Sequence, residues 1–132
     1  MGNIKNMSSK MEIPAYVSSW TDEYFHKSAF EAPIKYPDKK IIDFLSQFKK
    51  KESVKLYRGI NKYNGENYIG LESWTYKKEV ASRYAKEIGG KVIEKTFKAE
   101  NILLDTTLLN KDEKIFLGYD YKIDDKEALV II

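Results

Sequence analysis

The sequence contains no cysteine and only one histidine, His26. The absence of cysteine excludes disulfide frameworks, thiolate zinc sites and cysteine nucleophiles. A single histidine excludes every metal motif that needs two histidines, and it argues against a Ser-His-Asp hydrolase. We therefore expect a protein that uses no metal.

Long apolar runs are also missing. No apolar stretch reaches the roughly 18 residues that a membrane-spanning helix needs, and residues 1–14 lack the apolar segment of a signal peptide. Asn6 stands where the N-myristoylation pattern requires Ser or Thr. We expect a protein without membrane contact, located in the cytoplasm, or in the host-cell cytoplasm if a phage encodes it.

Neither sign of charge dominates. The chain carries 23 basic and 20 acidic residues, which gives a net charge of +3, and both signs are interspersed along its length. Because nucleic-acid-binding domains typically carry a basic stripe, this pattern argues against nucleic acid as the partner. Hydrophobic residues make up 42% of the chain and charged residues 33%, which is typical of a soluble globular protein.

The length of 132 residues favours one domain. Residues 1–13 are polar and show no period, so we expect a flexible N-terminus followed by a single domain over residues 14–132. Hydrophobic periodicity predicts helices over residues 15–30, after the N-cap Asp38, and over residues 76–88. It predicts strands over residues 52–60, 71–75, 91–97, 101–104 and 128–132.

Two segments between these elements are predicted as loops. Residues 61–70 are rich in Gly and Asn, and residues 111–123 are expected to form a hairpin or an ordered loop. The order is therefore helices first, then mostly strands with one inserted helix, which is an α+β arrangement.

Arginine is rare, because only Arg58 and Arg83 interrupt a basic set that is otherwise lysine. Arg58 lies between apolar residues and next to a glycine. The planar guanidinium fork can grip a phosphate or carboxylate with two parallel hydrogen bonds. A structural ion pair at a strand end explains Arg58 equally well, and the sequence leaves both interpretations open.

Polar groups end or interrupt three otherwise apolar strands. They lie in the segments Leu56–Gly59, Glu72–Thr75 and Asp125–Glu127. Residues two apart in a strand point to the same side, so Ser73 and Thr75 share a face, as do Asp125 and Glu127. A carboxylate at the mouth of a buried strand is costly unless it is hydrogen-bonded. An arginine, two hydroxyls and two carboxylates that converge on one cleft would suit a ligand with phosphates and ribose.

In this order, the motifs resemble the arginine–serine–glutamate class of ADP-ribosyltransferases, which includes bacterial toxins and phage enzymes that modify host proteins. The resemblance rests on Tyr57-Arg58-Gly59 at a strand end, Ser73-x-Thr75 followed by a helix, and Asp125-x-Glu127 followed by an aliphatic strand. It covers residues 56–132, and the N-terminal helices fit the helical preamble of the family loosely.

The resemblance implies a fold of two packed, mostly antiparallel sheets after N-terminal helices, with NAD+ bound as co-substrate in the cleft between the sheets. It implies that Arg58 holds the phosphate and ribose part and that the Gly59 backbone binds the nicotinamide amide. It further implies that Ser73 orients the catalytic Glu127 while Thr75 supports that strand. Glu127 would hydrogen-bond the ribose 2′-hydroxyl and stabilise the positive charge that develops as nicotinamide leaves.

The remaining roles that the resemblance implies concern the acceptor and the two rings of NAD+, nicotinamide and adenine. Asp125 would position or activate the accepting group. Tyr57, Tyr76 and Tyr84 are candidates for stacking on nicotinamide or adenine, although we expect at least two of these three to pack in the buried core instead. Segment Asn110–Asp124 would contact an acceptor protein. We expect Phe116, Tyr119 and Tyr121 to make these contacts, although ordinary hairpin packing explains these three aromatics equally well.

Two departures from the family pattern leave alternatives open. Arg58 and Ser73 are 15 residues apart, which is short for the family, and Asp125 stands where the family has Glu or Gln, so the acceptor is not fixed. Asp112 and Glu113 form a rival acidic pair before residues 114–117. We prefer Glu127 because the following strand is wholly apolar, whereas Lys114 interrupts the rival strand.

The function predicted from these residues is mono-ADP-ribosyl transfer from NAD+ to a protein side chain. Hydrolysis of NAD+ by the same site is a close variant. A catalytically silent module of the same fold that binds or inhibits a larger partner is the alternative from a different class, and a nucleic-acid-binding domain that stacks bases on its tyrosines is a third.

Overall fold

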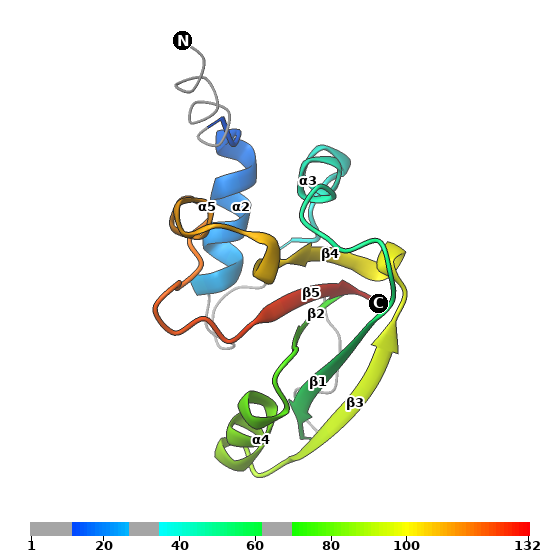
Figure 1. Ribbon diagram of the computed structural model, residues 1–132. Helices are drawn as coiled ribbons and strands as arrows, with labels where there is room; N and C mark the ends of the chain where they lie inside the picture. The colour runs from blue at the N-terminus through cyan, green and yellow to red at the C-terminus, as the bar shows by residue number, and fades with distance from the viewer. Residues whose placement is uncertain (1–11, 27–34, 62–69) are drawn as a thin grey trace.

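The computed structural model of the protein describes residues 12–26, 35–61 and 70–132. These residues form a mixed α and β structure (Figure 1). Its elements, in chain order, are α2 Ala15–His26, α3 Lys39–Leu45, β1 Val54–Ile60, β2 Leu71–Thr75, α4 Lys78–Glu87, β3 Lys91–Phe97, β4 Ile102–Asp105, α5 Lys111–Phe116 and β5 Glu127–Ile131, with short 3₁₀ turns at Ala99–Asn101 and Thr106–Leu108. Among the described residues, no helix is long and apolar enough to cross a membrane.

The strands form one antiparallel sheet in the order β3-β1-β2-β5-β4. β1 pairs with β3 along its whole length, and β2 pairs with β5 from Leu71 to Thr75. In the described part of the chain, by contrast, β1 and β2 are in register at one position, Tyr57 opposite Thr75. The sheet therefore nearly divides between β1 and β2, and the β1–β3 pair swings away from β2 and β5 (Figure 1).

Two apolar cores lie on opposite faces of β5. Because side chains alternate along a strand, Leu129 and Ile131 pack into a core with α2 and α3, whereas Ala128 and Val130 pack into a second core with β1 and β3. The second core contains Leu56 of β1, which is fully buried. The β1–β3 pair thus covers the face of β5 that the N-terminal helices leave open.

Helix α4 packs against β1 at a glycine. A Cβ atom on Gly59 would lie 2.7 Å from the Ala81 carbonyl oxygen and 2.8 Å from the Ala85 backbone nitrogen. These distances are shorter than any real contact of a methyl group, so only glycine allows this close approach of helix and strand. Ala81 and Ala85 are themselves buried and small, and they complete the seam.

The structure confirms most of the predicted elements, within a few residues at their ends. Asp38 caps α3 as expected, since its carboxylate accepts a hydrogen bond of 3.1 Å from the Ile41 backbone N–H. α4 begins at Lys78, later than predicted, and the predicted cap Thr75 accepts a 3.0 Å bond from the Lys77 N–H. The predicted end of the first helix, the loop at 61–70 and the flexible N-terminus fall largely outside the described residues.

Two expectations need correction. Residues 111–116 form helix α5 rather than a hairpin or loop, because Asn110 and Glu113 make a capping box with reciprocal 2.8 Å hydrogen bonds. The described residues also contain one five-stranded sheet instead of two packed sheets. The physical reason is that Tyr57 of β1 still pairs with Thr75 of β2, so the two groups of strands belong to one continuous sheet.

Candidate active site

A cavity of about 590 Å³ lies at the point where β1 diverges from β2. Helix α4 forms one wall, Tyr24 of α2 contributes to another, and the start of β5 completes the lining. Eight of the site residues predicted from the sequence line this cavity, namely Tyr57, Arg58, Gly59, Ser73, Thr75, Tyr84, Asp125 and Glu127. The volume lies within the range of small-molecule and cofactor sites.

Glu127 interacts with a short chain of hydroxyl groups. The Ser73 and Tyr24 hydroxyl oxygens are 2.8 Å apart, and Ser73 hydrogen-bonds the Glu127 carboxyl group. Burial raises the pKa of Glu127 to about 7, whereas the Ser73 hydrogen bond and the Arg58 charge act in the opposite direction. Burial also raises the pKa of Tyr24 to about 12, so its hydroxyl keeps its proton at neutral pH.

The register of β2 and β5 explains why these groups meet. Thr75 lies opposite Glu127 and Ser73 lies opposite Leu129, so both hydroxyl residues share the face of Glu127. On the other strand, the Arg58 Nη1 donates a 2.6 Å hydrogen bond to the Ser73 carbonyl oxygen. Arg58 therefore has a structural role between β1 and β2, and its side chain also lines the cavity.

Asp125 lines the cavity with a side chain that is 40% exposed, and two interactions hold it in place. Its backbone carbonyl accepts a 2.6 Å hydrogen bond from the Thr75 hydroxyl. Its carboxylate accepts a 3.3 Å bond from Nη2 of Arg83 on α4. The negative charge of Asp125 also contributes to the raised pKa of Glu127, so the two carboxyl groups act on each other electrostatically.

The turn before β5 has an unusual backbone. Asp124 and Lys126 have φ values of 42° and 52°, in the left-handed region that non-glycine residues rarely occupy. The Asp124 carboxylate accepts bonds of 2.9 Å from Lys114 and 3.1 Å from Lys126. Burial alone would raise the pKa of Asp124, but these lysine hydrogen bonds lower it to about 2. Lys114, Lys126 and Asp124 together form a lysine–aspartate clamp. This clamp holds the turn that presents Asp125 and Glu127.

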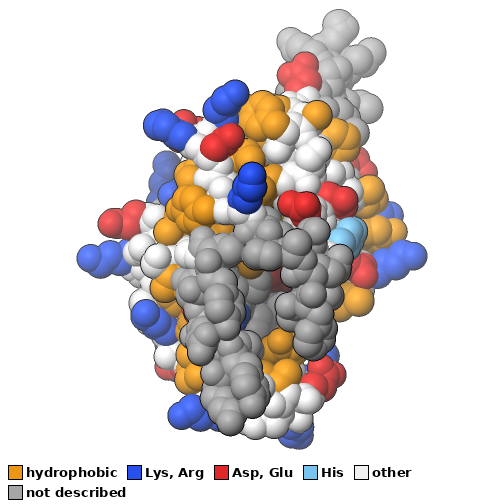
Figure 2. All heavy atoms as spheres, turned by 180° about the vertical axis from the view of Figure 1, so that it is seen from behind, with side chains coloured by type: hydrophobic (Ala, Val, Ile, Leu, Met, Phe, Trp, Pro, Cys, Tyr) orange, Lys and Arg blue, Asp and Glu red, His pale blue; other side chains and the backbone are white. Residues whose placement is uncertain are grey.

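A smaller cavity of about 160 Å³ adjoins the large one and shares Ile123, Asp125 and Glu127 with it. Phe25 and Tyr119 line it and pack edge to face, with ring centroids 5.0 Å apart. Viewed from behind, the single histidine lies beside acidic side chains (Figure 2). His26 pairs with Asp22 at 3.2 Å, and it also lines the smaller cavity.

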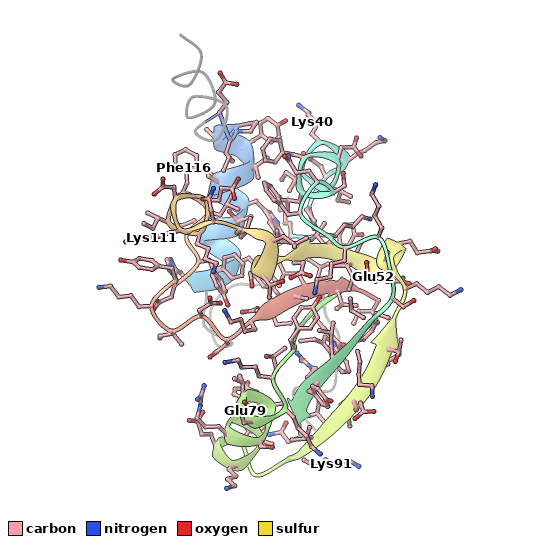
Figure 3. The ribbon with its side chains drawn as sticks, viewed as in Figure 1. Lys40, Glu52, Glu79, Lys91, Lys111 and Phe116 are labelled. Atoms are coloured by element: carbon pink, nitrogen blue, oxygen red, sulfur yellow. The ribbon has the colours of Figure 1, made fainter. Side chains whose placement is uncertain are left out.

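The three aromatic residues predicted to contact an acceptor protein have different surroundings. Phe116 lies on the outer side of α5, away from the sheet (Figure 3), and 37% of its surface is exposed. Tyr119 is buried, so it contributes to packing. The Tyr121 ring lies under the Lys111 ammonium group at 5.0 Å. Ile123, which the sequence analysis did not select, is 66% exposed and lines both cavities.

Two other candidates from the sequence lie away from the cavity. The rival Glu113 accepts a hydrogen bond from its own N-cap and does not line the cavity. The Tyr76 hydroxyl donates a 2.5 Å bond to the buried Asp105, and its ring lies 4.4 Å from the Lys50 ammonium group. Glu113 and Tyr76 therefore serve the local structure.

Sequence reasoning did not assign Tyr24 or Arg83 to the site. Tyr24 stands at helical spacing with other aromatics of α2, and its pattern shows nothing except a buried face. Arg83 carried a usable signal, because the rarity of arginine that drew attention to Arg58 applies equally to Arg83.

Comparison of the chain with protein-family models, curated proteins and solved structures finds no significant match. Within the described ranges, no group of three or more His, Cys, Asp or Glu side chains is arranged to hold a metal ion. The functional assignment therefore depends on the geometry of the cavity.

Proposed function

We propose that this protein is a mono-ADP-ribosyltransferase that transfers ADP-ribose from NAD+ to a protein side chain. One observation carries the proposal: Arg58, Ser73 and Glu127 come from three different strands and line one cavity of about 590 Å³. These are the residue types, in the chain order, on which the resemblance to ADP-ribosyltransferases rests. The near division of the sheet at this cavity supports a relation to the two-sheet fold of that family.

The two walls of the cavity suit a dinucleotide. Arg58 supplies a guanidinium for the phosphate and ribose part. Gly59 lines the cavity where β1 packs against α4, and the resemblance gives its backbone the nicotinamide amide as ligand. Tyr84, which is 46% exposed, and Tyr57 offer rings for stacking on nicotinamide or adenine.

Glu127 provides the central chemical step. Its carboxylate hydrogen-bonds the 2′-hydroxyl of the nicotinamide ribose and stabilises the positive charge that grows on the ribose as the bond to nicotinamide breaks. This role needs the ionised form, so the Ser73 hydrogen bond, which lowers the pKa, favours the active state against burial. With a pKa of about 7, we expect turnover to rise with pH through neutrality.

The acceptor approaches past Asp125. This partly exposed carboxylate lines the cavity and orients the accepting group, while Thr75 fixes its backbone. The acceptor protein contacts segment Asn110–Asp124, where Phe116 and Ile123 are the exposed apolar side chains nearest in sequence to the site. The place of action is the cytoplasm of the cell, or of a host cell.

The test is incubation of the purified protein with labelled NAD+ and cell extract, with measurement of nicotinamide release and of labelled protein bands. We expect bands with the wild type and their loss with Glu127→Gln, whereas Glu113→Gln keeps them. Loss only with Glu113→Gln would move the site to Glu113.

The same assay separates the alternatives. Nicotinamide release without labelled protein would indicate an NAD+ hydrolase. No release, with or without extract, would favour a silent module that binds or inhibits a larger partner. Binding to nucleic acid that weakens steeply with salt would favour the third alternative.

A further inference from the structure

Arg83 extends from α4 to Asp125 at the edge of β5, and its side chain lines the large cavity. Its Nη2 atom lies 3.3 Å from Oδ1 of Asp125, and both side chains line the large cavity with Glu127. The two side chains are 61% and 40% exposed, so water screens the pair and the contact adds little stability. The pair can therefore open and close at small cost.

The partner of Arg83 is the notable feature. Asp125 is the carboxylate to which the proposed function gives the task of orienting the acceptor. Its side chain lines the cavity together with Glu127, and its negative charge contributes to the raised pKa of Glu127. A guanidinium group of this chain thus already lies where an acceptor nitrogen has to be held. The other arginine, Arg58, instead directs Nη1 to the Ser73 carbonyl oxygen.

We propose that Arg83 is an acceptor for the protein's own ADP-ribosyl transfer, which rests on the proposed function. Asp125 takes a proton from the Arg83 guanidinium, and the freed electron pair on nitrogen forms the bond to C1′ of the nicotinamide ribose. The C1′–nitrogen bond to nicotinamide breaks, and its electron pair leaves with neutral nicotinamide. The proton passes from Asp125 to water. NAD+ is the only co-reactant.

This reaction limits itself. The product carries an ADP-ribosyl group on a residue that lines the cavity, so the group occupies the space that the next NAD+ needs. It also converts the charged partner of Asp125 into a bulky, doubly phosphorylated one. We therefore expect nicotinamide release without added acceptor to show a burst of about one equivalent, followed by decline.

The experiment uses the full chain with NAD+ and no other protein, followed by intact-mass measurement and peptide mapping. We expect a mass gain of one ADP-ribosyl group on the α4 peptide at Arg83. Glu127→Gln should reduce the labelling by at least about 100-fold. Arg83→Lys keeps the charge beside Asp125 and Arg83→Gln removes it, and both should abolish the label at this position together with the burst of nicotinamide release that accompanies it.

The matched control is Lys86→Gln, which removes a cation from an exposed position of the same helix outside the cavity. We expect it to leave the label at Arg83 unchanged. Because attack within one molecule is favoured by proximity, the rate of labelling should not depend on protein concentration. A Glu127→Gln protein mixed with the wild type should stay unlabelled.

The outcomes are distinguishable from failure of the proposed function. Nicotinamide release, or labelling of extract proteins, with no label on Arg83 overturns the self-modification and leaves the transferase proposal standing. Labelling of the Glu127→Gln protein by the wild type shows transfer between molecules and overturns the intramolecular step. Absence of nicotinamide release under all conditions overturns both proposals.

Discussion

Two acidic residues on neighbouring strands have opposite surroundings. Asp105 at the end of β4 is 1% exposed, and its carboxylate accepts hydrogen bonds from the Tyr76 hydroxyl, the Thr107 backbone and the Thr107 hydroxyl. Glu127 at the start of β5 has the Ser73 hydroxyl as its hydrogen-bond partner in the described residues and faces the large cavity.

The difference shows how the fold treats a carboxylate that hydrogen bonds hold in the structure and one that faces a cavity. Hydrogen bonds satisfy Asp105, so its burial is compatible with a stable strand end. Glu127 is desolvated with fewer compensating bonds, as its pKa of about 7 shows. Such an imbalance costs stability in the empty protein and is typical of a catalytic group.

The largest expected effect is on catalysis. Glu127→Gln should lower kcat for nicotinamide release by at least about 100-fold, because a neutral amide cannot stabilise the developing positive charge. Asp105→Asn should keep kcat per folded molecule within about threefold of the wild type, since Asp105 does not line the cavity. Equal losses of kcat in the two variants would remove the distinction between these acids.

The next effect is on the stability of the fold. We expect loss of the Asp105 carboxylate to destabilise the protein, in contrast to loss of the Glu127 carboxylate. Asp105→Asn replaces an acceptor-only group by an amide whose N–H₂ faces the Tyr76 or Thr107 donors, so we expect a loss of about 3 kcal/mol in the free energy of unfolding. Urea denaturation at pH 7 measures it. Asp112→Asn, at an exposed position of α5, is the control and should stay within about 0.5 kcal/mol of the wild type.

The sequence predicts this part of the molecule unevenly. Alternation and the apolar run at the C-terminus locate β5, and the two-residue spacing of Ser73 and Thr75 correctly indicates that they share a face. The sequence analysis did not select Asp105, because nothing in the neighbouring sequence indicates that the Tyr76 hydroxyl, 29 residues earlier, hydrogen-bonds to its carboxylate. Such a contact depends on tertiary packing.

The errors of the sequence analysis have similar causes. The aromatic residues around Gly118 led us to expect a hairpin or an ordered loop over residues 111–123, but the capping box of Asn110 and Glu113 favours a helix over residues 111–116. The single-sheet topology depends on one pair between β1 and β2, which periodicity cannot reveal. Tyr24 reaches the site because α2 brings its hydroxyl group to Ser73 of β2. The helical spacing of Tyr24 alone predicts only a position in the buried core.

A smaller effect concerns the clamp that supports Glu127. Lys114→Met removes the buried partner of Asp124, which should reduce the free energy of unfolding by about 2 kcal/mol and lower kcat severalfold by loosening the turn before β5. The side chains of Lys114 and Asp124 are only 13% and 16% exposed, so solvent cannot fully replace the pair. Lys111→Met, three residues earlier at an exposed position, is the control for denaturation and kinetics.

Lowering the pH tests the same clamp through its acidic partner, Asp124. The pKa of Asp124 is lowered to about 2 from an ordinary value of 3.8, so its contribution to stability is present above about pH 4 and is lost as the pH falls toward 2. Lys114→Met should weaken this acid dependence. An unchanged acid limb of the stability curve in Lys114→Met would show that Lys126 alone holds Asp124.

The smallest effect is the pH dependence that Glu127 itself imparts to stability. Its pKa is raised from 4.5 to about 7 in the folded protein, so between these values the folded state binds more protons than the unfolded state. The free energy of unfolding should therefore fall as pH rises from about 4.5 to 7, by about 1.5 kcal/mol once solvent in the open cavity is allowed for. Glu127→Gln removes this dependence, so its stability relative to the wild type should be greater at pH 8 than at pH 5, whereas the exposed Glu100→Gln should follow the wild-type curve. Urea denaturation at the two pH values measures both variants, and a constant difference between Glu127→Gln and the wild type would mean that the carboxylate of Glu127 is as well compensated as that of Asp105.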